Sequence, residues 1–489
     1  MKLKIKLINW NAGLPVAMLN DKTAEKLGVR IRDRISIKID SKEIDTIVDT
    51  IGTLIKEDEI AVSSEIKKRL NLRKGQKIDV NLAMNPDSLN YIKKKLNNKI
   101  LSKKEIEEII SDIVSNSLSE AEIALFVSGM YKFGMTMKET IYLIDSIVDN
   151  GNSIDFKNKF VADKHSIGGI AGNRTTPILV SICAAAGLIL PKNSSRAITS
   201  AAGTADVIET IANIEFSIKD LKKIIRKTGA CMVWGGSLNL VPADSMIIQV
   251  EKMLNLDPES QLLASIMSKK IAVGSDYILI DIPYGKNAKV DKERAMRLKR
   301  KFEYLGRHYK KKMKVVLTDG SQPIGSGIGP SLELMDVLKV LRRENGPRDL
   351  EEKSLFLSGE LLELTGKAKK GQGIKIAKCI LDSGKALKKF EEIIKAQGGS
   401  LKKIRYGKYK QDILAKKSGT VYEIHNKKIN LLARTAGCPA DKYSGLYIHV
   451  YLNQEIKKEE KLITIYAESK SRLKEALRFF EKEKPVKVR

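Results

Sequence analysis

Residues 164–176 read KHSIGGIAGNRTT, and this stretch decides how the middle of the chain is interpreted. The segment FVADKHS, which ends at Ser166, is typical of a strand, and the segment that begins NRTTPILV is typical of a helix. Glycines between a strand and a helix let backbone N–H groups approach an oxyanion, and hydroxyl groups and the helix N-terminus attract it further. Lys164 adds a full positive charge. Taken alone, the stretch is either a phosphate cradle or a flexible turn.

A second loop of the same design favours the phosphate cradle. Residues 193–204 read NSSRAITSAAGT, in which Arg196 supplies the charge, and related turns occur at 234–239 (WGGSLN) and 320–330 (GSQPIGSGIGP). None of these loops has the GxxxxGK[ST] pattern, and KHSIGG lacks the GxGxxG spacing of a dinucleotide site. The expected ligand is therefore free phosphate or a phosphate ester, not a nucleoside triphosphate held in the usual way.

The alternation of strand-like and helix-like segments around these loops predicts an α/β domain over residues 161–400. Strands are expected at 160–166, 188–192, 230–236, 276–285 and 313–320, and helices at 173–187, 205–211 and 330–342. Alternation of this kind is typical of a mostly parallel sheet, which binds ligands where its strands end and its helices begin.

The first 84 residues contain a weak internal repeat. Residues 20–39 resemble residues 63–82, so that Ile35 matches Ile78 and Ile37 matches Val80. Each copy predicts a capped short helix, a basic turn and an alternating strand. Neither half can bury its apolar face alone, so the repeat predicts a small, pseudo-symmetric β-barrel-like domain.

The remaining segments predict two further domains. Residues 85–160 contain three capping boxes, Ser102 with Glu105, Ser119 with Glu122 and Thr136 with Glu139, which indicate a helical domain. Part of 242–270 is expected to join it. Residues 401–489 predict a compact β-rich (α+β) domain for packing or assembly, with strands at 420–432, 445–453 and 461–469 and a helix at 470–483.

Composition excludes several other classes of protein. The chain of 489 residues carries a formal charge of +29, but lysines alternate with glutamates and aromatic residues are only 5%, which disfavours base stacking. No apolar run approaches the roughly 18–20 residues that span a membrane, and the N-terminus lacks the apolar block of a signal peptide. The four cysteines and four histidines are scattered, so no disulfide framework or metal site is expected. We expect a cytoplasmic protein that binds neither nucleic acid nor membrane.

A further segment, residues 255–270 (NLDPESQLLASIMSKK), contains candidate residues for acid–base chemistry. Asp257 either caps the coming helix or protonates a leaving group. Ser265 and Lys269 are four residues apart and therefore share a helix face, which is either an ordinary polar face or part of a site. His165 is either a core histidine or, given its place between Lys164 and Ser166, a site residue.

Together, KHSIGG, SSRAITSAAGTADVIE, LDPESQLLASIMSKK and DGSQPIGSGIGPSLE resemble the thymidine phosphorylase family of nucleoside phosphorylases, and most closely its archaeal AMP phosphorylase branch. The resemblance covers most of the chain. It implies phosphorolysis, in which phosphate attacks C1′ of a ribosyl group and the base leaves, in a cleft between a helical and an α/β domain. It also implies an added N-terminal domain of about the length of the repeat-containing segment.

Two departures from the pyrimidine enzymes favour a nucleotide substrate. By resemblance, Val250 falls where those enzymes hold the pyrimidine with an arginine, and Lys289, in GKNAKV, falls where they carry an aromatic residue. An added cation suits a 5′-phosphate. The expected reaction is AMP plus phosphate giving adenine and ribose 1,5-bisphosphate, with CMP and UMP as further substrates, in nucleotide salvage or AMP degradation.

The resemblance implies a role for each matching residue. Asp257 is the expected proton donor, and His165 and Lys269 are additional candidates. The phosphate-binding residues are expected to be Lys164, Ser166, Thr176 and Ser194. The AMP-binding residues are expected to be Gly169, Ser195, Arg196, Ala197, Ile198, Thr199, Ser200, Thr204, Ser265 and Lys289. No metal or cofactor is expected, phosphate being a co-substrate, and the family implies a dimer or a larger homo-oligomer.

Three alternatives stay open at this point. A thymidine or pyrimidine nucleoside phosphorylase would run the same reaction on a nucleoside. A phosphoribosyltransferase would need Mg²⁺ and a pyrophosphorylated ribose, and the acidic cluster that holds the metal is not evident in the sequence. A basic nucleic-acid-binding protein would lose affinity steeply with salt, but leaves the loops unexplained.

Overall fold

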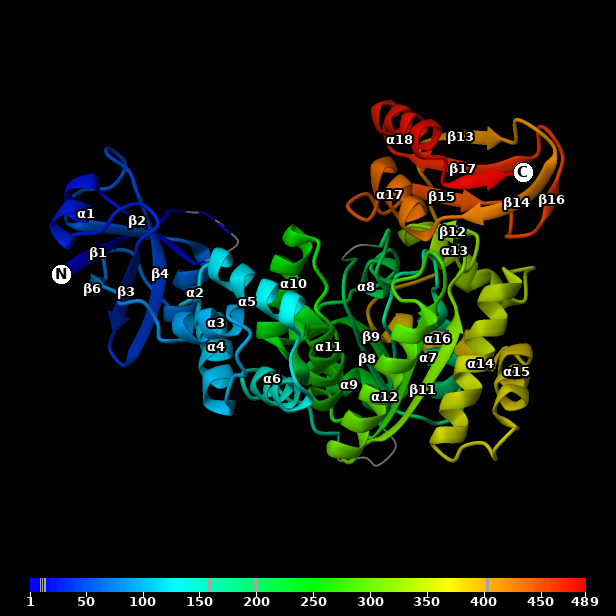
Figure 1. Cartoon of the computed structure of the whole chain (residues 1–489), viewed down its shortest axis with the longest axis horizontal. Coiled ribbons are helices and arrows are strands. Elements are labelled where there is room, and N and C mark those ends of the chain that lie inside the picture. Colours follow the sequence, from blue (N-terminus) through cyan, green and yellow to red (C-terminus); the bar gives the residue numbers. More distant parts are fainter. Residues whose placement is uncertain (9, 11, 13–14, 157–160, 198–199, 402–403) are drawn as a thin grey trace. The chain divides into compact units, whose positions relative to one another are not determined.

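A computed structural model describes the chain from residue 1 to 489 except for residues 9, 11, 13–14, 157–160, 198–199 and 402–403. It divides into two compact units. The first comprises residues 1–151 and 242–265, and the second comprises residues 152–241 and 266–489. Figure 1 labels most of the helices and strands named below.

The N-terminal part of the first unit is a closed barrel, as the repeat predicts. Its strands are β1 (Lys2–Lys6), β2 (Val16–Leu19), β3 (Arg34–Ile39), β4 (Lys42–Thr50), β5 (Glu59–Val62) and β6 (Lys77–Leu82), in the order β1-β5-β2-β4-β3-β6. Helix α1 (Asp21–Leu27) precedes β3, and helix α2 (Ser64–Leu70) precedes β6, so both copies have the same helix–strand form. The matched residues Ile35, Ile37, Ile78 and Val80 are all buried, because each copy contributes its apolar face to one shared core.

Helices make up the rest of the first unit. They are α3 (Ser88–Leu96), α4 (Lys103–Ser115), α5 (Glu120–Phe133), α6 (Met137–Asp149), α10 (Pro242–Leu254) and the first half of α11 (Glu259–Ala272). All three predicted capping boxes form at the starts of α4, α5 and α6. Lys95 and Glu139 form a buried ion pair of 3.0 Å between α3 and α6.

The second unit contains the predicted parallel α/β architecture. Strands β7 (Ala162–Ser166), β10 (Tyr277–Tyr284) and β11 (Lys312–Asp319) form a parallel sheet in the order β11-β10-β7. Strands β8 (Leu190–Ser194) and β9 (Ala230–Trp234) pair in parallel, and a parallel bridge between Val161 and Ile189 continues the arrangement from β7 to β8. The carboxyl ends of these strands therefore meet along one edge.

Helices pack against these strands and against one another, and together they bury the central core. They are α7 (Thr175–Ala185), α8 (Thr204–Ile208), α9 (Ile218–Thr228), α12 (Lys292–His308), α13 (Pro330–Arg342), α14 (Arg348–Leu364), α15 (Gly373–Asp382) and α16 (Lys385–Ala396). Helix α7 is buried along nearly its whole length, which is why its sequence is apolar on every face. A 3₁₀ turn, η1 (Gly235–Leu238), follows β9, and the short strand β12 (Gly327–Ile328) precedes α13.

The C-terminal part of the second unit is α+β, with two corrections to the sequence prediction. The strand predicted over 445–453 ends at Ile448, and the strand predicted over 420–432 ends at Ile424. Its strands are β13 (Tyr409–Leu414), β14 (Gly419–Ile424), β15 (Gly445–Ile448), β16 (Glu455–Ile456), β17 (Lys461–Ala467) and β18 (Val486–Val488). Helix α18 (Lys470–Glu483) lies where it was predicted, next to α17 (Asn426–Ala436) (Figure 1).

The prediction of a strand over 420–432 is wrong beyond Ile424, because α17 begins at Asn426. Ile429, Leu432, Ala433 and Ala436 recur at helical spacing and are buried, and this pattern overrides the apolar run that resembled a strand. No helix in the described part of the chain combines the length and apolar character that crossing a bilayer requires.

Candidate active site

Lys164 places an ammonium group in the interior at the end of β7. Its side chain is 2% exposed, and its Nζ donates to Thr175 Oγ1 across 2.9 Å. Burial lowers the pKa of Lys164 to about 7, although the nearby Asp281 carboxylate partly opposes this. Among the described residues, no carboxylate lies within ion-pairing distance of its Nζ. A buried cation without a carboxylate partner favours an anionic ligand.

Several buried polar groups near the ends of β7 and β8 also lack partners among the described residues. They are His165 Nδ1, the side-chain amide of Asn193, and the hydroxyls of Ser166 and Ser194. Ser166 pairs with Asp281 in the register of β7 and β10, and no hydrogen bond of good geometry joins their side chains. Burial raises the pKa of Asp281, but the charges of Lys353 and Lys164 outweigh it and hold this pKa below its ordinary value. Buried polar groups are normally hydrogen-bonded, so this cluster has the donors that a phosphate requires.

His165 differs from its neighbours in being held neutral. Burial lowers the pKa of its imidazole well below the ordinary value, and the charges of Lys270 and Lys192 lower it further. Near pH 7 the ring is therefore uncharged, and it can contribute a hydrogen bond but no positive charge.

The predicted loops are joined by Arg174, a residue that the sequence reasoning did not single out. Its Nη1 donates to Thr204 Oγ1 across 2.8 Å, and its Nη2 donates to the Ala202 carbonyl across 2.8 Å. Glu333 holds the same guanidinium, at 2.7 Å from Nε and 2.6 Å from Nη2. Arg174 precedes Thr175 and the predicted phosphate residue Thr176, which is buried in the first turn of α7. The two loops are thus fixed to each other at this point.

The second loop is closed on itself by Asp206. One oxygen of this carboxylate accepts from the backbone N–H groups of Ala197 and Gly203, each at 2.7 Å. A Cβ at Gly203 would lie 2.4 Å from the Ser195 carbonyl oxygen, so only glycine fits the turn. Ser200 Oγ donates to the Ala202 carbonyl. The predicted residues Ile198 and Thr199 lie outside the described part of the chain.

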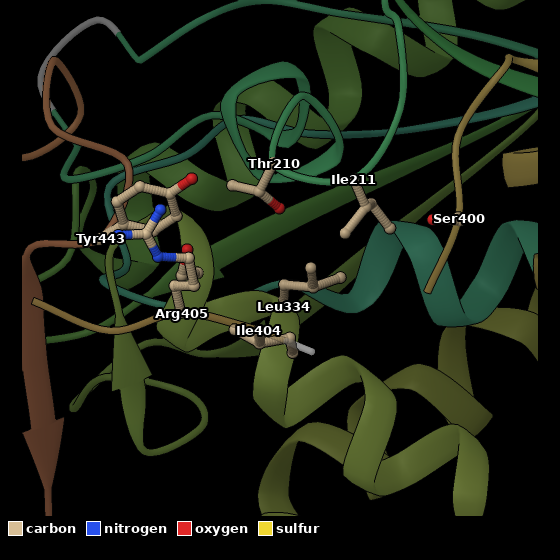
Figure 2. A pocket seen from close by; sticks show the side chains of 8 residues that line it. Thr210, Ile211, Leu334, Ser400, Ile404, Arg405 and Tyr443 are labelled. Carbon is tan, nitrogen blue, oxygen red and sulfur yellow. The ribbon is translucent and has the colours of Figure 1, made fainter. Parts of the chain in front are cut away.

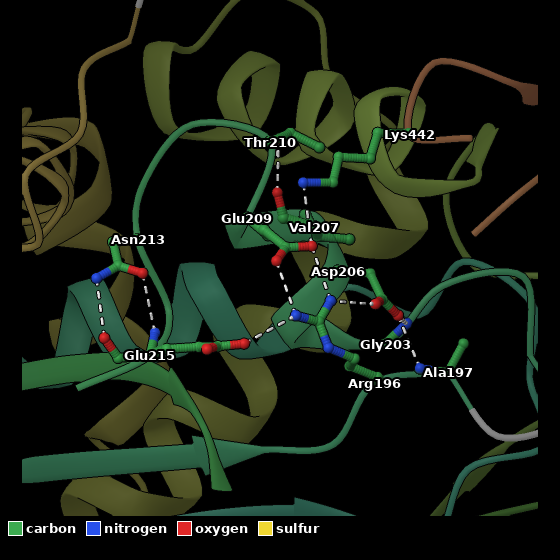
Figure 3. A network of polar contacts seen from close by, with 10 residues as sticks. All are labelled: Arg196, Ala197, Gly203, Asp206, Val207, Glu209, Thr210, Asn213, Glu215 and Lys442. Atoms are coloured by element: carbon green, nitrogen blue, oxygen red, sulfur yellow. Dashed lines mark hydrogen bonds and ion pairs between the residues drawn. The ribbon is translucent and has the colours of Figure 1, made fainter. Parts of the chain in front are cut away.

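Arg196 lies in this loop, but its guanidinium is engaged by carboxylates (Figure 3). It makes two hydrogen bonds of 2.7 Å to Glu209 and ion pairs to Asp206 (3.5 Å) and Glu215 (3.4 Å). It also stacks on the Trp234 ring at 5.0 Å, and Lys442 pairs with Glu209. Since these contacts neutralise its charge, any role of Arg196 toward a nucleotide rests on its backbone or on the loop conformation that it holds.

The predicted nucleotide residues Gly169 and Lys289 are in direct contact. Gly169 has φ +91°, and a Cβ there would lie 2.7 Å from Lys289 Cβ and 2.9 Å from its backbone nitrogen. The glycine therefore allows the 285–290 turn to approach the first loop closely.

Helix α17 supplies two further residues that the sequence reasoning missed. Asn426 Oδ1 accepts from the Ala171 N–H at 3.1 Å, and Asn426 Nδ2 donates to the Gly320 carbonyl at 3.0 Å. Asn430 Oδ1 accepts from the Ala201 N–H at 2.9 Å. Both side chains are buried. The C-terminal domain thus holds both predicted ligand loops, a role beyond packing or assembly.

The remaining candidates lie on or near α11. Asp257 and Ser265 belong to the first unit, whereas Lys269 belongs to the second. Asp257 lies two residues before α11 begins at Glu259, and Val250 is buried in α10. The roles of Asp257 and Ser265 stay predictions.

A separate cavity of about 250 Å³ lies elsewhere in the second unit (Figure 2). It is lined by Thr210, Ile211, Ser331, Leu334, Ser400, Ile404, Arg405 and Tyr443. None of these is a predicted site residue, and the unpartnered polar groups of β7 and β8 are not among them, so we place the candidate site at the strand ends instead. No cluster of three or more metal-binding side chains occurs in the described ranges.

Comparison with known proteins gives three family matches along the chain. Residues 89–151 match the helical bundle domain of a glycosyl transferase family, and residues 158–387 match the α/β domain of the same family. Residues 420–487 match the C-terminal domain of pyrimidine nucleoside phosphorylases.

Relatives of similar length match this chain over nearly all of its residues. The chain is 42% identical to an AMP phosphorylase of Methanococcus aeolicus, over 99% of this chain and 97% of that one. It is also 42% identical to an AMP phosphorylase of Pyrococcus furiosus, over 100% of this chain and 98% of that one. The anthranilate phosphoribosyltransferase of Thermus thermophilus has a similar fold, with a TM-score of 0.52 and 17% identity over 63% of this chain and 99% of that one.

Proposed function

Because the chain belongs to the AMP phosphorylase branch of the thymidine phosphorylase family, we propose that it cleaves AMP with inorganic phosphate to give adenine and ribose 1,5-bisphosphate. The observation that carries the proposal is the buried ammonium of Lys164 on β7, together with the hydroxyls of Ser166 on β7 and Ser194 on β8, which have no hydrogen-bond partner among the described residues. This arrangement supports binding of the phosphate that attacks the ribose.

In the proposed mechanism, Lys164, Ser166, Thr176 and Ser194 bind the attacking phosphate. Positioning converts a bimolecular encounter into a reaction within one complex. A phosphate oxygen forms the new bond to C1′ as the C1′–N9 bond breaks and its electron pair leaves with adenine. Positive charge develops on the ribosyl group in this transition state, and the bound phosphate anion stabilises it.

The leaving group and the nucleotide require the other predicted residues. Asp257 protonates the departing adenine and regains its proton from solvent, which is worth about 10²–10⁴-fold in rate for a positioned acid. The loop of Ser195 to Thr204, with Gly169 and Ser265, holds the nucleotide, and Lys289 pairs with the 5′-phosphate. Neutral His165 orients the sugar or the phosphate by a hydrogen bond, and Lys269 lies on the helix that carries Ser265.

The proposal extends to the setting of the reaction. CMP and UMP are further candidate substrates, no cofactor beyond phosphate is required, and we propose a cytoplasmic homo-oligomer. The main alternative within the family is a pyrimidine nucleoside phosphorylase. Lys289 disfavours it, because a free nucleoside offers this cation no phosphate.

Asp257→Asn tests the mechanism. The variant should lower kcat for phosphorolysis of AMP by about 10²–10⁴-fold and leave the KM for phosphate within a factor of about three, since only the proton is removed. The matched control is Glu259→Gln, which removes a carboxylate two residues further on and should keep near-normal turnover. Near-normal turnover of Asp257→Asn would exclude the acid role.

A further inference from the structure

The charged groups buried around the predicted phosphate site do not balance. In the second unit, Arg174 pairs with Glu333 at 2.6 Å and Lys353 pairs with Asp281 at 3.3 Å. Asp163 is then the carboxylate that serves both Lys192, at 3.3 Å, and Lys270, at 2.5 Å. The side chains of Asp163, Lys192 and Lys270 are only 1%, 6% and 0% exposed, respectively.

With each of these groups and Lys164 in its charged form, the cations among them exceed the carboxylates by two in the described part of the chain. Among the described residues, one lysine of the Asp163 group has no second carboxylate within ion-pairing distance, and Lys164 has no carboxylate at that distance. Uncompensated charge in a protein interior is costly, and an anion that enters the site relieves that cost. A doubly charged anion matches the excess, whereas a singly charged anion leaves half of it.

The Asp163 group is built into the strands that carry the predicted phosphate residues. Asp163 precedes Lys164 on β7, and its carboxylate accepts from the Lys164 backbone N–H at 2.7 Å. Lys192 stands two residues before Ser194 on β8 and donates to the Asn193 carbonyl at 2.8 Å. Lys192 and Ser194 therefore share a face of β8, as Asp163 and His165 share a face of β7. Lys270 reaches the same carboxylate from α11.

We propose that Lys192 and Lys270, which share the single carboxylate of Asp163, are positioning residues that make this site select a doubly charged tetrahedral oxyanion. The proposal rests on the proposed function, in which that anion is the attacking phosphate. The two lysines act through the strand ends and through their field, without touching the reacting atoms.

Anion binding is also coupled to protonation. Burial lowers the pKa of Lys270 and of Lys164 to about 7, so both groups are only partly charged in the anion-free protein. A bound dianion favours their charged forms, and binding therefore takes up protons and weakens as the pH rises above about 7. The charged groups around Lys270 are Asp163, Lys192 and Lys269, and those around Lys164 are Asp281, Lys353, Lys192 and Arg174.

Inorganic sulfate is the appropriate probe, because it has the shape of phosphate and stays a dianion throughout the neutral range. Its binding to the full-length protein is measured by calorimetry without nucleotide. The result therefore tests anion binding alone, whereas the proposed function is tested by AMP turnover, so that either can fail without the other. Lys192→Met and Lys270→Met should each raise the Kd for sulfate by about tenfold or more. Perchlorate, a tetrahedral monoanion, should bind the unmodified protein at least about tenfold more weakly than sulfate. In the two variants, the ratio of the Kd for perchlorate to the Kd for sulfate should be smaller.

The matched control is Lys95→Met, which removes a buried lysine from its one-to-one pair with Glu139 in the first unit. This variant should lower the melting temperature but change the Kd for sulfate by less than about twofold. Equal Kd values for sulfate in the unmodified protein, Lys192→Met and Lys270→Met would overturn the proposal.

A measurement on the unmodified protein keeps the proposal falsifiable if these variants do not fold. If binding takes up one proton, the Kd for sulfate should rise by up to about tenfold for each pH unit above 7, and a second proton would add a further factor of the same size. Calorimetry in two buffers of different ionisation enthalpy should show the same proton uptake. A Kd that is constant from neutral to alkaline pH would contradict the coupling, and perchlorate binding as tight as sulfate binding would contradict the selection of a dianion.

Discussion

Gly169 lies so close to Lys289 that no side chain fits between them: a Cβ on the glycine would be 2.7 Å from the Lys289 Cβ. Gly169→Ala should displace the turn that carries Lys289 and raise the KM for AMP about tenfold or more, because misplacement by an ångström is costly for a positioning group. Steady-state kinetics with varied AMP measures this.

Gly168→Ala is the matched control for that variant. Gly168 also has a positive φ, +84°, but a Cβ there would meet nothing within 4 Å. Both alanine variants carry similar backbone strain, and only one of them collides with the turn. An equal increase in KM for both variants would show that strain, and not the contact with Lys289, is responsible.

Lys289→Ala tests the recognition of the 5′-phosphate. The loss of a charge-assisted contact should raise the KM for AMP about tenfold or more and leave the weaker phosphorolysis of adenosine nearly unchanged. Lys286→Ala is the control, since Lys286 is in the same turn but is exposed and pairs with Glu423. Equal effects of Lys289→Ala on AMP and adenosine would refute the assignment.

Asn430 should be required for the nucleotide loop although it belongs to the C-terminal domain. Asn430→Ala leaves the buried N–H of Ala201 without its acceptor, which costs about 1–3 kcal/mol and loosens the loop. The KM for AMP should rise while the KM for phosphate changes less. Lys427→Ala, an exposed position on the same helix, should leave both KM values unchanged. If Asn430→Ala has kinetics like those of Lys427→Ala, the hydrogen bond does not position the loop.

The buried ammonium of Lys164 should make the stability of the anion-free protein depend on pH. Its pKa is about 7 in the folded chain and has its ordinary, higher value in the unfolded chain, so above pH 7 the unfolded state binds more protons. The contribution of this group to the melting temperature should therefore rise as the pH increases from about 7 to 9. Thermal unfolding of the unmodified protein and of Lys164→Met, in a phosphate-free buffer, measures the difference.

The melting temperature of Lys164→Met should rise less steeply between about pH 7 and 9, because the variant has no lysine at this position to release a proton on folding. Identical slopes for the two proteins would show that the lysine keeps its proton in the folded state. Saturating sulfate should reduce the slope of the unmodified protein, since the anion favours the charged lysine.

Much of the fold could be predicted because it depends on local patterns. Apolar alternation and glycine-rich turns mark β7, β8, β10 and β11, three capping boxes mark helix starts, and the repeat at Ile35 and Ile78 marks the barrel. Each of these signals lies within a short window of sequence.

The contacts that complete the site could not be predicted in this way, because their partners are distant in the sequence. Asn430 is 229 residues from Ala201, and Arg174 is 159 residues from Glu333. Asparagine and arginine on polar segments give no signal until the fold brings their partners near. The sequence likewise predicts that the charge of Arg196 faces a ligand, whereas in the structure Glu209, 13 residues further on, pairs with its guanidinium.

The most direct test of the central claim is the identification of products from AMP and inorganic phosphate by the purified protein. We predict equimolar adenine and ribose 1,5-bisphosphate, with no adenine released when phosphate is omitted and little turnover of thymidine. Adenine release that is independent of phosphate, or a preference for thymidine over AMP, would contradict the proposed function.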